Sequence, residues 1–122
     1  MNASDRARLL HALDSADLVL IGASNGLDMA EGLNIFAWDD RFREAYGDLA
    51  SACGARCILQ GLLTPWPDRT LAEAWQARYA ATEWLGYEPT PLMAKLRGLT
   101  EGRDCFVLTC NTDGHFARAG FI

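Results

Sequence analysis

Two polar residues that lie two positions apart, Asn111 and Asp113, follow the apolar run Cys105–Thr109. A carboxamide both donates and accepts hydrogen bonds, and an ionised carboxylate accepts them. At the carboxyl end of a buried strand, this pair would be well placed to contact a ligand. The alternative is that the two residues cap the helix that follows, because Asn and Asp are preferred at that position. The residues alone leave both interpretations open.

A second segment that could carry chemistry lies near the start of the chain. The apolar run of residues 18–21 predicts a short buried strand, Gly22 ends this run, and a helical pattern begins at about Gly26. A strand, a glycine turn and a helix N-terminus together form the geometry that binds phosphate. The spacing is not that of the dinucleotide motif, in which a glycine would replace Ser24, nor that of a P-loop. An ordinary strand-to-helix turn is therefore the alternative interpretation.

The composition limits the class of protein. The chain has 122 residues, of which half are hydrophobic and 22% are charged, which is typical of one globular domain. The formal net charge of −5 argues against nucleic acid as the main partner. It allows a dinucleotide, because backbone N–H groups bind phosphate without lysines. The apolar runs are too short to cross a bilayer, and the polar N-terminus has no signal-peptide pattern. We therefore expect a cytoplasmic protein without a membrane partner.

Four cysteines raise the question of a metal site or a disulfide. Cys53 and Cys57 lie four positions apart, which is not a zinc-ribbon spacing, and the sequence has no C-x-x-C pair. Without a secretory signal, a disulfide framework is not expected. Cys105 and Cys110 flank an apolar run and are predicted to be small core residues. We expect reduced cysteines and no metal ligands.

Several segments favour helices. Residues 4–16 form an amphipathic pattern that Ser4 or Asp5 would cap, with leucines packed beside the first strand. Further helices are expected at residues 41–55, at about residues 70–85 with Thr70 as the N-cap, and from Thr90 onward with Pro91 in the first turn. The side chains expected to be buried by these later helices are Phe42, Tyr46, Leu49, Leu71, Trp75, Tyr79, Leu92, Met93, Leu96 and Leu99.

Two apolar strands with helices between them indicate an α/β fold. Roughly 80 residues separate the strands, far more than a simple crossover between parallel strands needs. We therefore predict a partial Rossmann-like parallel sheet, with an inserted helical lobe at about residues 36–88. This lobe would sit above the strand ends, where ligands bind in open α/β sheets. In the loop that leads into it, Phe36 and Trp38 either close over a ligand or cover the core.

The two segments together resemble the N-terminal part of the sirtuins, the family of NAD-dependent protein deacylases. Gly22-Ala23-Ser24 stands where sirtuins have Gly-Ala-Gly, and Gly32-Leu33-Asn34-Ile35-Phe36 stands where they have Gly-Ile-Pro-Asp-Phe. Thr109-Cys110-Asn111-Thr112-Asp113 stands where they have Thr-Gln-Asn-Ile-Asp, and Ala119-Gly120 matches the Ala-Gly that follows. The resemblance covers nearly all of residues 1–122. The form Gly22-Ala23-x-x-Gly26-Leu27 is most similar to the microbial branch that includes the macrodomain-linked sirtuins, some of which are ADP-ribosyltransferases.

This resemblance implies NAD as the cofactor, and a protein as the second substrate that is either acylated or able to accept ADP-ribose. The Gly22 loop would hold the pyrophosphate, Phe36 would cover the nicotinamide and Asp113 would hold its carboxamide. Asn111 would be the catalytic residue, because it would position the ribose next to the bond that breaks. The residues implied to bind NAD are Gly22, Ala23, Ser24, Asn25, Gly26, Asp28, Phe36, Asn111 and Asp113.

Several positions depart from the sirtuin pattern. Asp28 replaces a serine, Ala37 replaces an arginine that helps to hold the cofactor, and Cys110 replaces a glutamine. The alternative function is therefore a degenerate module that binds NAD or ADP-ribose without chemistry. Sirtuins continue with a catalytic histidine and a zinc-binding lobe, and His115 lies too close to Asn111 to be that histidine. We accordingly expect this chain to be part of a longer enzyme and to be inactive by itself.

Overall fold

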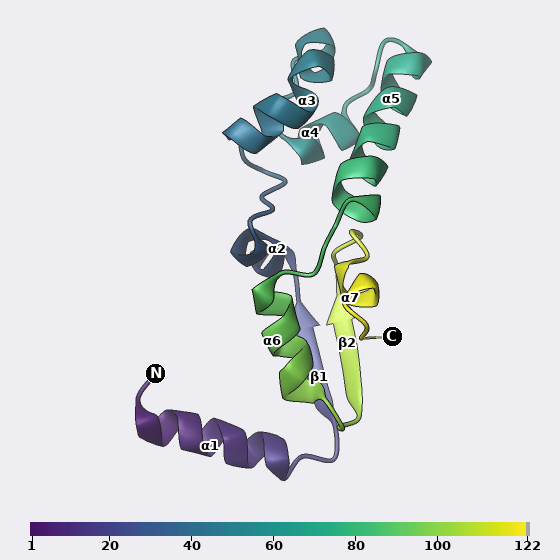
Figure 1. The fold of residues 1–122 in the computed structure, drawn as a ribbon. Coiled ribbons are helices and arrows are strands. Elements are labelled where there is room, and N and C mark those ends of the chain that lie inside the picture. Colours follow the sequence, from purple (N-terminus) through teal and green to yellow (C-terminus); the bar gives the residue numbers. More distant parts are fainter. Residues whose placement is uncertain (122) are drawn as a thin grey trace.

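The computed structural model describes residues 1–121 and shows a mixed α/β chain that is mostly helical, with a group of helices standing beyond one end of a small parallel sheet (Figure 1). Among the described residues, no helix is both long enough and apolar enough to cross a membrane. The elements in chain order are α1 (Ala3–Asp14), β1 (Val19–Ala23), α2 (Asn25–Glu31), α3 (Asp40–Cys53), α4 (Ile58–Leu63), α5 (Arg69–Tyr79), the π-helix η1 (Ala80–Leu85), α6 (Pro91–Thr100), β2 (Cys105–Thr109) and α7 (His115–Arg118).

The two strands pair in parallel, with Val19 opposite Cys105 and Ala23 opposite Thr109. The bounds of β2 are those predicted. The expectation that Gly22 ends the first strand is wrong, because β1 continues through Gly22 to Ala23, and β2 pairs with both residues. Residues 1–121 contain these two strands alone, so a Rossmann-like sheet stays a prediction.

Helix α6 runs along one face of this sheet (Figure 1). Its predicted start is confirmed, since the Thr90 hydroxyl accepts a hydrogen bond from the Met93 N–H at 3.3 Å and Pro91 lies in the first turn. Met93 is fully buried, but Leu92 and Leu99 are 40% and 42% exposed. The prediction of a four-residue buried face is therefore wrong for these two leucines. A single helix on a two-stranded sheet can bury only a narrow stripe of its own surface.

The other face of the sheet is apolar and exposed. Leu18, Leu20, Phe106 and Leu108 are each more than half exposed, and Leu20 lies directly opposite Phe106 in the sheet. Parallel sheets are normally covered on both faces, because crossover connections place helices there. In residues 1–121, helix α6 covers one face of the sheet, and the other face has no such cover.

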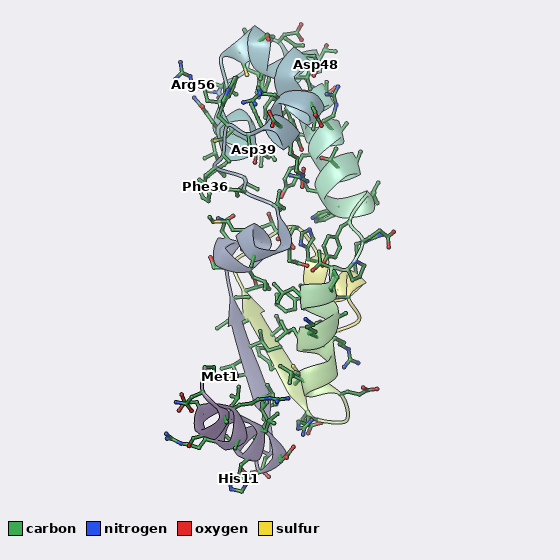
Figure 2. All side chains as sticks on the ribbon, turned by 60° about the vertical axis from the view of Figure 1, so that its left-hand side comes forward. Met1, His11, Phe36, Asp39, Asp48 and Arg56 are labelled. Carbon is green, nitrogen blue, oxygen red and sulfur yellow. The ribbon has the colours of Figure 1, made fainter. Side chains whose placement is uncertain are left out.

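Helix α1 extends away from the sheet at the amino ends of the strands, and none of its residues is buried (Figure 1). The prediction that it packs beside the first strand is therefore wrong. Its N-cap is Asn2 instead of the predicted Ser4 or Asp5, and the Asn2 side chain accepts the Asp5 N–H at 2.8 Å. His11 points outward from this helix, as expected for an exposed side chain (Figure 2).

Helices α3, α4 and α5 enclose an aromatic core beyond the carboxyl ends of the strands (Figure 1). Phe42, Tyr46 and Trp75 are at most 1% exposed, and the ring centroids of Tyr46 and Trp75 lie 4.9 Å apart. Aromatic pairs at this distance add to the stability gained by burial alone. The prediction that these three side chains belong to the core is confirmed.

The junction between α5 and η1 differs from the single helix that was expected. Asp68 is the N-cap of α5, because its carboxylate accepts the Thr70 N–H at 2.7 Å, so the prediction of Thr70 as the cap is wrong. After Tyr79 the helix widens into the π-helix η1, which ends at Gly86. Turns of π-helix are rare and occur often at functional sites.

Helix α4 was not predicted, because Gly61 interrupts its apolar sequence. In the structure, Gly61 packs against the indole ring of Trp75, and a Cβ atom built on it would lie 2.0 Å from the Trp75 Cζ2 atom. Only glycine allows this approach, which explains its place in a helix despite a low helix propensity.

We expect Gly61→Ala to destabilise the chain by about 1–3 kcal/mol, because the buried Trp75 ring cannot move without disturbing the aromatic core. The matched control is Gly47→Ala in α3, where an added Cβ meets nothing within 4 Å. This control should gain about 0.5–1 kcal/mol, the usual helical preference for alanine. Urea unfolding followed by tryptophan fluorescence measures both changes, and a stabilised Gly61→Ala chain would contradict the packing described here.

Candidate functional site

The loops that follow the two strands meet at the carboxyl end of the sheet. The Ser24 hydroxyl oxygen and the Cys110 sulfur lie 3.1 Å apart, and the Asn111 amide donates a hydrogen bond to Asp28 Oδ1 at 2.7 Å. Parallel pairing brings these loops together although more than 80 positions separate the residues in each pair. Cys110 is exposed, so the prediction that it is a core residue is wrong, and all four cysteines carry free thiols.

A cavity of about 330 Å³ lies between these loops and the helical group. Six of the nine residues implied to bind a ligand line it: Ser24, Asn25, Asp28, Phe36, Asn111 and Asp113. The other three do not, because Gly22 and Ala23 lie within β1 and Gly26 lies in the first turn of α2.

The loop between α2 and α3 contributes Phe36, which is 56% exposed and stands between the sheet and the helical group (Figure 2). Trp38 is 52% exposed and lies beside Phe42, with ring centroids 5.2 Å apart. The two interpretations of this loop apply to different residues. Trp38 partly covers the helical core, whereas Phe36 lines the cavity.

Asp28 lies at the inner wall of the cavity and is only 4% exposed. The pKa of its carboxyl group is raised from 3.8 to about 6, mainly by burial, with smaller contributions from the negative charge and hydrogen bond of Asp113, while His115 opposes the shift. The loss of hydration thus dominates, and a second carboxylate adds to it.

Asp113 and Asn111 have different partners. Asp113 Oδ1 accepts the backbone N–H of His115, the first residue of α7, at 2.8 Å. The N-cap of this helix is Gly114, so Asp113 binds an N–H at the helix start without being the predicted cap residue. Asn111 instead turns its amide toward Asp28 on α2. Asp113 therefore makes a local hydrogen bond, whereas Asn111 makes one between the two loops.

Glu31 is a site residue that the sequence analysis missed. Its carboxylate is 2% exposed and accepts hydrogen bonds from the Tyr87 hydroxyl at 2.8 Å and from the Thr90 hydroxyl at 2.6 Å. The signal that could have found it is the spacing from Asp28, because residues three apart share one face of a helix.

His115 is also buried, with 3% of its surface exposed, and its ring stacks on Tyr87 with centroids 3.6 Å apart. Its Nε2 atom lies 3.2 Å from the Glu83 carbonyl oxygen, and its Nδ1 atom lies 3.4 Å from Glu31 Oε2. With Glu31, it lines a second cavity of about 210 Å³.

The π-helix η1 contacts the segment that follows β2. Its Glu83 carbonyl faces His115, and its Trp84 indole donates to the Thr112 carbonyl at 2.5 Å. The Glu83 carboxylate is itself buried and pairs with Arg41 of α3. The helical group is thereby attached to the site through a π-helix, a rare conformation that occurs often at functional sites.

Comparison with known proteins gives a similarity to one protein of known activity but shows no family. No protein-family model matches the chain. A protein ADP-ribosyltransferase from Staphylococcus aureus (strain Mu50 / ATCC 700699) is 26% identical over 110 residues. The match covers 90% of this chain and 34% of that protein, so the chain spans about a third of the length of this relative.

The buried charge of Asp28 leads to a testable pH dependence. Its pKa rises from 3.8 to about 6 on folding, so the folded chain binds this proton more tightly than the unfolded chain does. The stability that the bound proton contributes is lost as the pH rises through about 6. At pH 7.5 in metal-free buffer, Asp28→Asn should therefore unfold at a higher urea concentration than the parent chain. Its free energy of unfolding should be higher by up to about 3 kcal/mol. At pH 4 the two chains should differ little.

The asparagine keeps an oxygen that can accept from Asn111, so the variant removes mainly the charge. The exposed Asp104→Asn is the control and should leave both midpoints in place. Parallel stability–pH curves for the parent chain and Asp28→Asn would show that Asp28 does not carry this charge penalty.

Proposed function

We propose that this chain is the NAD-binding part of a sirtuin-like protein ADP-ribosyltransferase. The similarity to a protein of that activity over 90% of the chain supports the proposal, as does the sirtuin-like order of the two loop motifs. The reaction would break the bond between nicotinamide and ribose in NAD and form a bond from the ribose to a group on a protein substrate. Deacylation through the same bond cleavage is the related alternative.

One observation carries the proposal: two buried carboxylates and a carboxamide, those of Asp28, Asp113 and Asn111, face one cavity at the carboxyl ends of parallel strands. Ligands bind at this place in open α/β sheets. The nicotinamide ring of NAD⁺ is a cation that carries a carboxamide. Carboxylates in a site of low polarity stabilise such a cation and accept hydrogen bonds from its amide.

The size of the cavity supports binding of a part of the cofactor. At about 330 Å³ it lies at the lower end of the range of about 300–1,000 Å³ for small-molecule sites, which suits the nicotinamide and its ribose. Because Asp28 holds the Asn111 nitrogen, Asn111 Oδ1 is left to accept a ribose hydroxyl. Asn111 would thus orient the ribose, and orientation supplies much of the rate in such reactions.

The charge argument gives a direct binding test. NAD⁺ should bind the 122-residue chain at least about tenfold more tightly than NADH, whose nicotinamide ring is neutral, since one such interaction is worth about 1.4 kcal/mol. Asp113→Asn should remove this preference while it keeps the hydrogen bond at the start of α7, because its Oδ1 still accepts the His115 N–H. Isothermal titration calorimetry measures both affinities, with the exposed Asp104→Asn as the control that should bind like the parent chain.

Equal affinity for NAD⁺ and NADH in the parent chain would overturn the assignment of the nicotinamide to this cavity. Catalysis is tested separately, by nicotinamide release from the whole protein that contains this chain and from its Asn111→Ala variant. Release that Asn111→Ala abolishes supports the transferase. Binding without release supports a degenerate sensor, which the replacement at Ala37 also favours.

A further inference from the structure

The hydrogen-bond partners of His115 leave one of its ring nitrogens facing an acceptor. Its Nε2 atom lies 3.2 Å from the Glu83 carbonyl oxygen, which can only accept, so Nε2 carries the proton. In the neutral ring, Nδ1 is then an acceptor, and it faces Glu31 Oε2 at 3.4 Å. Two acceptors in a buried site repel each other unless a cation lies between them.

The distance between these atoms distinguishes a proton from a metal ion. A proton shared by an imidazolium and a carboxylate would draw the two atoms to about 2.7–2.9 Å. Two ligands of one tetrahedral metal ion, each bound at about 2.0–2.1 Å, lie about 3.3–3.4 Å apart. The separation of 3.4 Å between His115 Nδ1 and Glu31 Oε2 is longer than such a charge-assisted hydrogen bond and fits two ligands of one metal ion.

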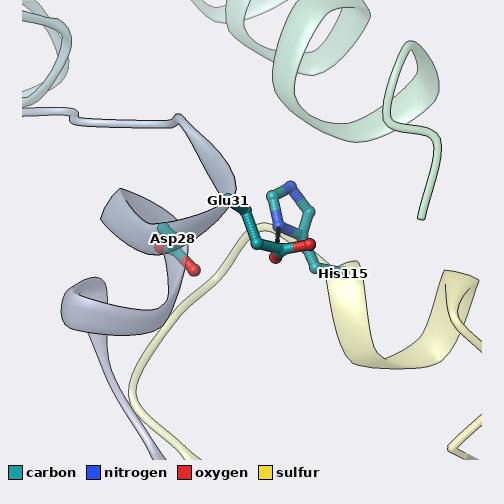
Figure 3. Close-up of side chains that lie close together, drawn as sticks. All are labelled: Asp28, Glu31 and His115. Carbon is teal, nitrogen blue, oxygen red and sulfur yellow. Dashed lines mark hydrogen bonds and ion pairs between the residues drawn. The ribbon is translucent and has the colours of Figure 1, made fainter. Parts of the chain in front are cut away.

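The charge around the ring also favours a cation. The carboxylate of Asp28 comes within 4.8 Å of the ligand atoms of Glu31 and His115 (Figure 3). Asp113 Oδ1 lies 3.8 Å from His115 Nδ1. All four side chains are buried, and Arg41, the arginine that shares a cavity wall with Glu31, is paired with Glu83. Buried carboxylates without a counter-charge are costly.

We propose that Asp28, Glu31 and His115 bind one divalent transition-metal ion, a site that goes beyond the proposed function and does not depend on whether NAD binds. One imidazole nitrogen and two carboxylate oxygens suit Zn²⁺ and its neighbours, whereas Mg²⁺ and Ca²⁺ select oxygen ligands alone. Three protein ligands leave a fourth position open, as in catalytic zinc sites.

The surrounding hydrogen bonds are those expected around metal ligands. The Glu83 carbonyl fixes the tautomer of His115, which is the usual partner of a metal-bound histidine. The hydroxyls of Tyr87 and Thr90 hold Glu31 Oε1, so that Oε2 is the oxygen turned toward the ring. Access is open on two sides, because Glu31 and His115 line one cavity and Asp28 lines the other.

Titration of the chelator-treated 122-residue chain with Zn²⁺ tests the site. We expect one Zn²⁺ per chain, with Asp28→Asn and His115→Gln each lowering the affinity at least about tenfold. The exposed His11→Gln is the matched control and should bind like the parent chain. Urea unfolding of the metal-free Asp28→Asn chain, set beside that of the parent chain, separates a loss of binding from a loss of folding.

The spectrum of bound Co²⁺ distinguishes binding at this site from binding by the four cysteine thiols. The Co²⁺ complex should lack a sulfur-to-metal charge-transfer band, because none of the three ligands is a cysteine. The proposal is overturned if Zn²⁺ does not bind at one per chain, if both ligand variants bind as tightly as the parent, or if Co²⁺ shows thiolate bonding. It is also overturned if ¹⁵N NMR finds both His115 nitrogens protonated at neutral pH and unchanged by Zn²⁺, since a buried imidazolium would then take the place of the metal.

Discussion

The parallel pairing of β1 with β2 is the constraint on which the rest of the structure depends. The register from Val19–Cys105 to Ala23–Thr109 brings the ends of both strands to one edge, and the loops that follow have no other reason to meet. The contact between Asn111 and Asp28 and that between Ser24 and Cys110 both follow from it. A shift of the register by one residue would turn each side chain to the opposite face of the sheet and would separate these pairs.

Above this edge, the site is unusual in the number of acidic groups that it buries. Asp28, Glu31, Glu83 and Asp113 are held by specific donors, among them the Tyr87 and Thr90 hydroxyls and Arg41. These donors lie far from the carboxylates in the sequence, so the burial of charge also ties α2, the segment before α6, α7 and the helical group together. A buried polar network of this kind is stabilising only while its members are satisfied. The π-helix η1 contributes Glu83 and Trp84 to this network.

Local signals in the sequence predicted the elements that depend on local chemistry. The bounds of β2, the start of α6 at Thr90–Pro91 and the aromatic core around Trp75 follow from capping rules and apolar spacing. Features that depend on distant partners were not predictable in this way. Gly22 looked like the end of a strand because its pairing with Leu108 lies more than 80 positions away. Glu31 was missed because its donors, the Tyr87 and Thr90 hydroxyls, come from the segment before α6. Helix α1 was expected to pack on a strand from which it extends away.

The long interval between β1 and β2 also determines the order in which the chain can fold as it is made. Ribosomes add about 5–20 residues per second, so the roughly 80 intervening residues delay the partner of β1 by about 4–16 s. The helices α3 to α5 contact one another over short sequence distances and can form during this interval, because local contacts close quickly. The apolar strand β1 must meanwhile remain unpaired in the nascent chain. For this protein, the period of greatest exposure to misassembly therefore falls during synthesis, before the last quarter of the chain has left the ribosome.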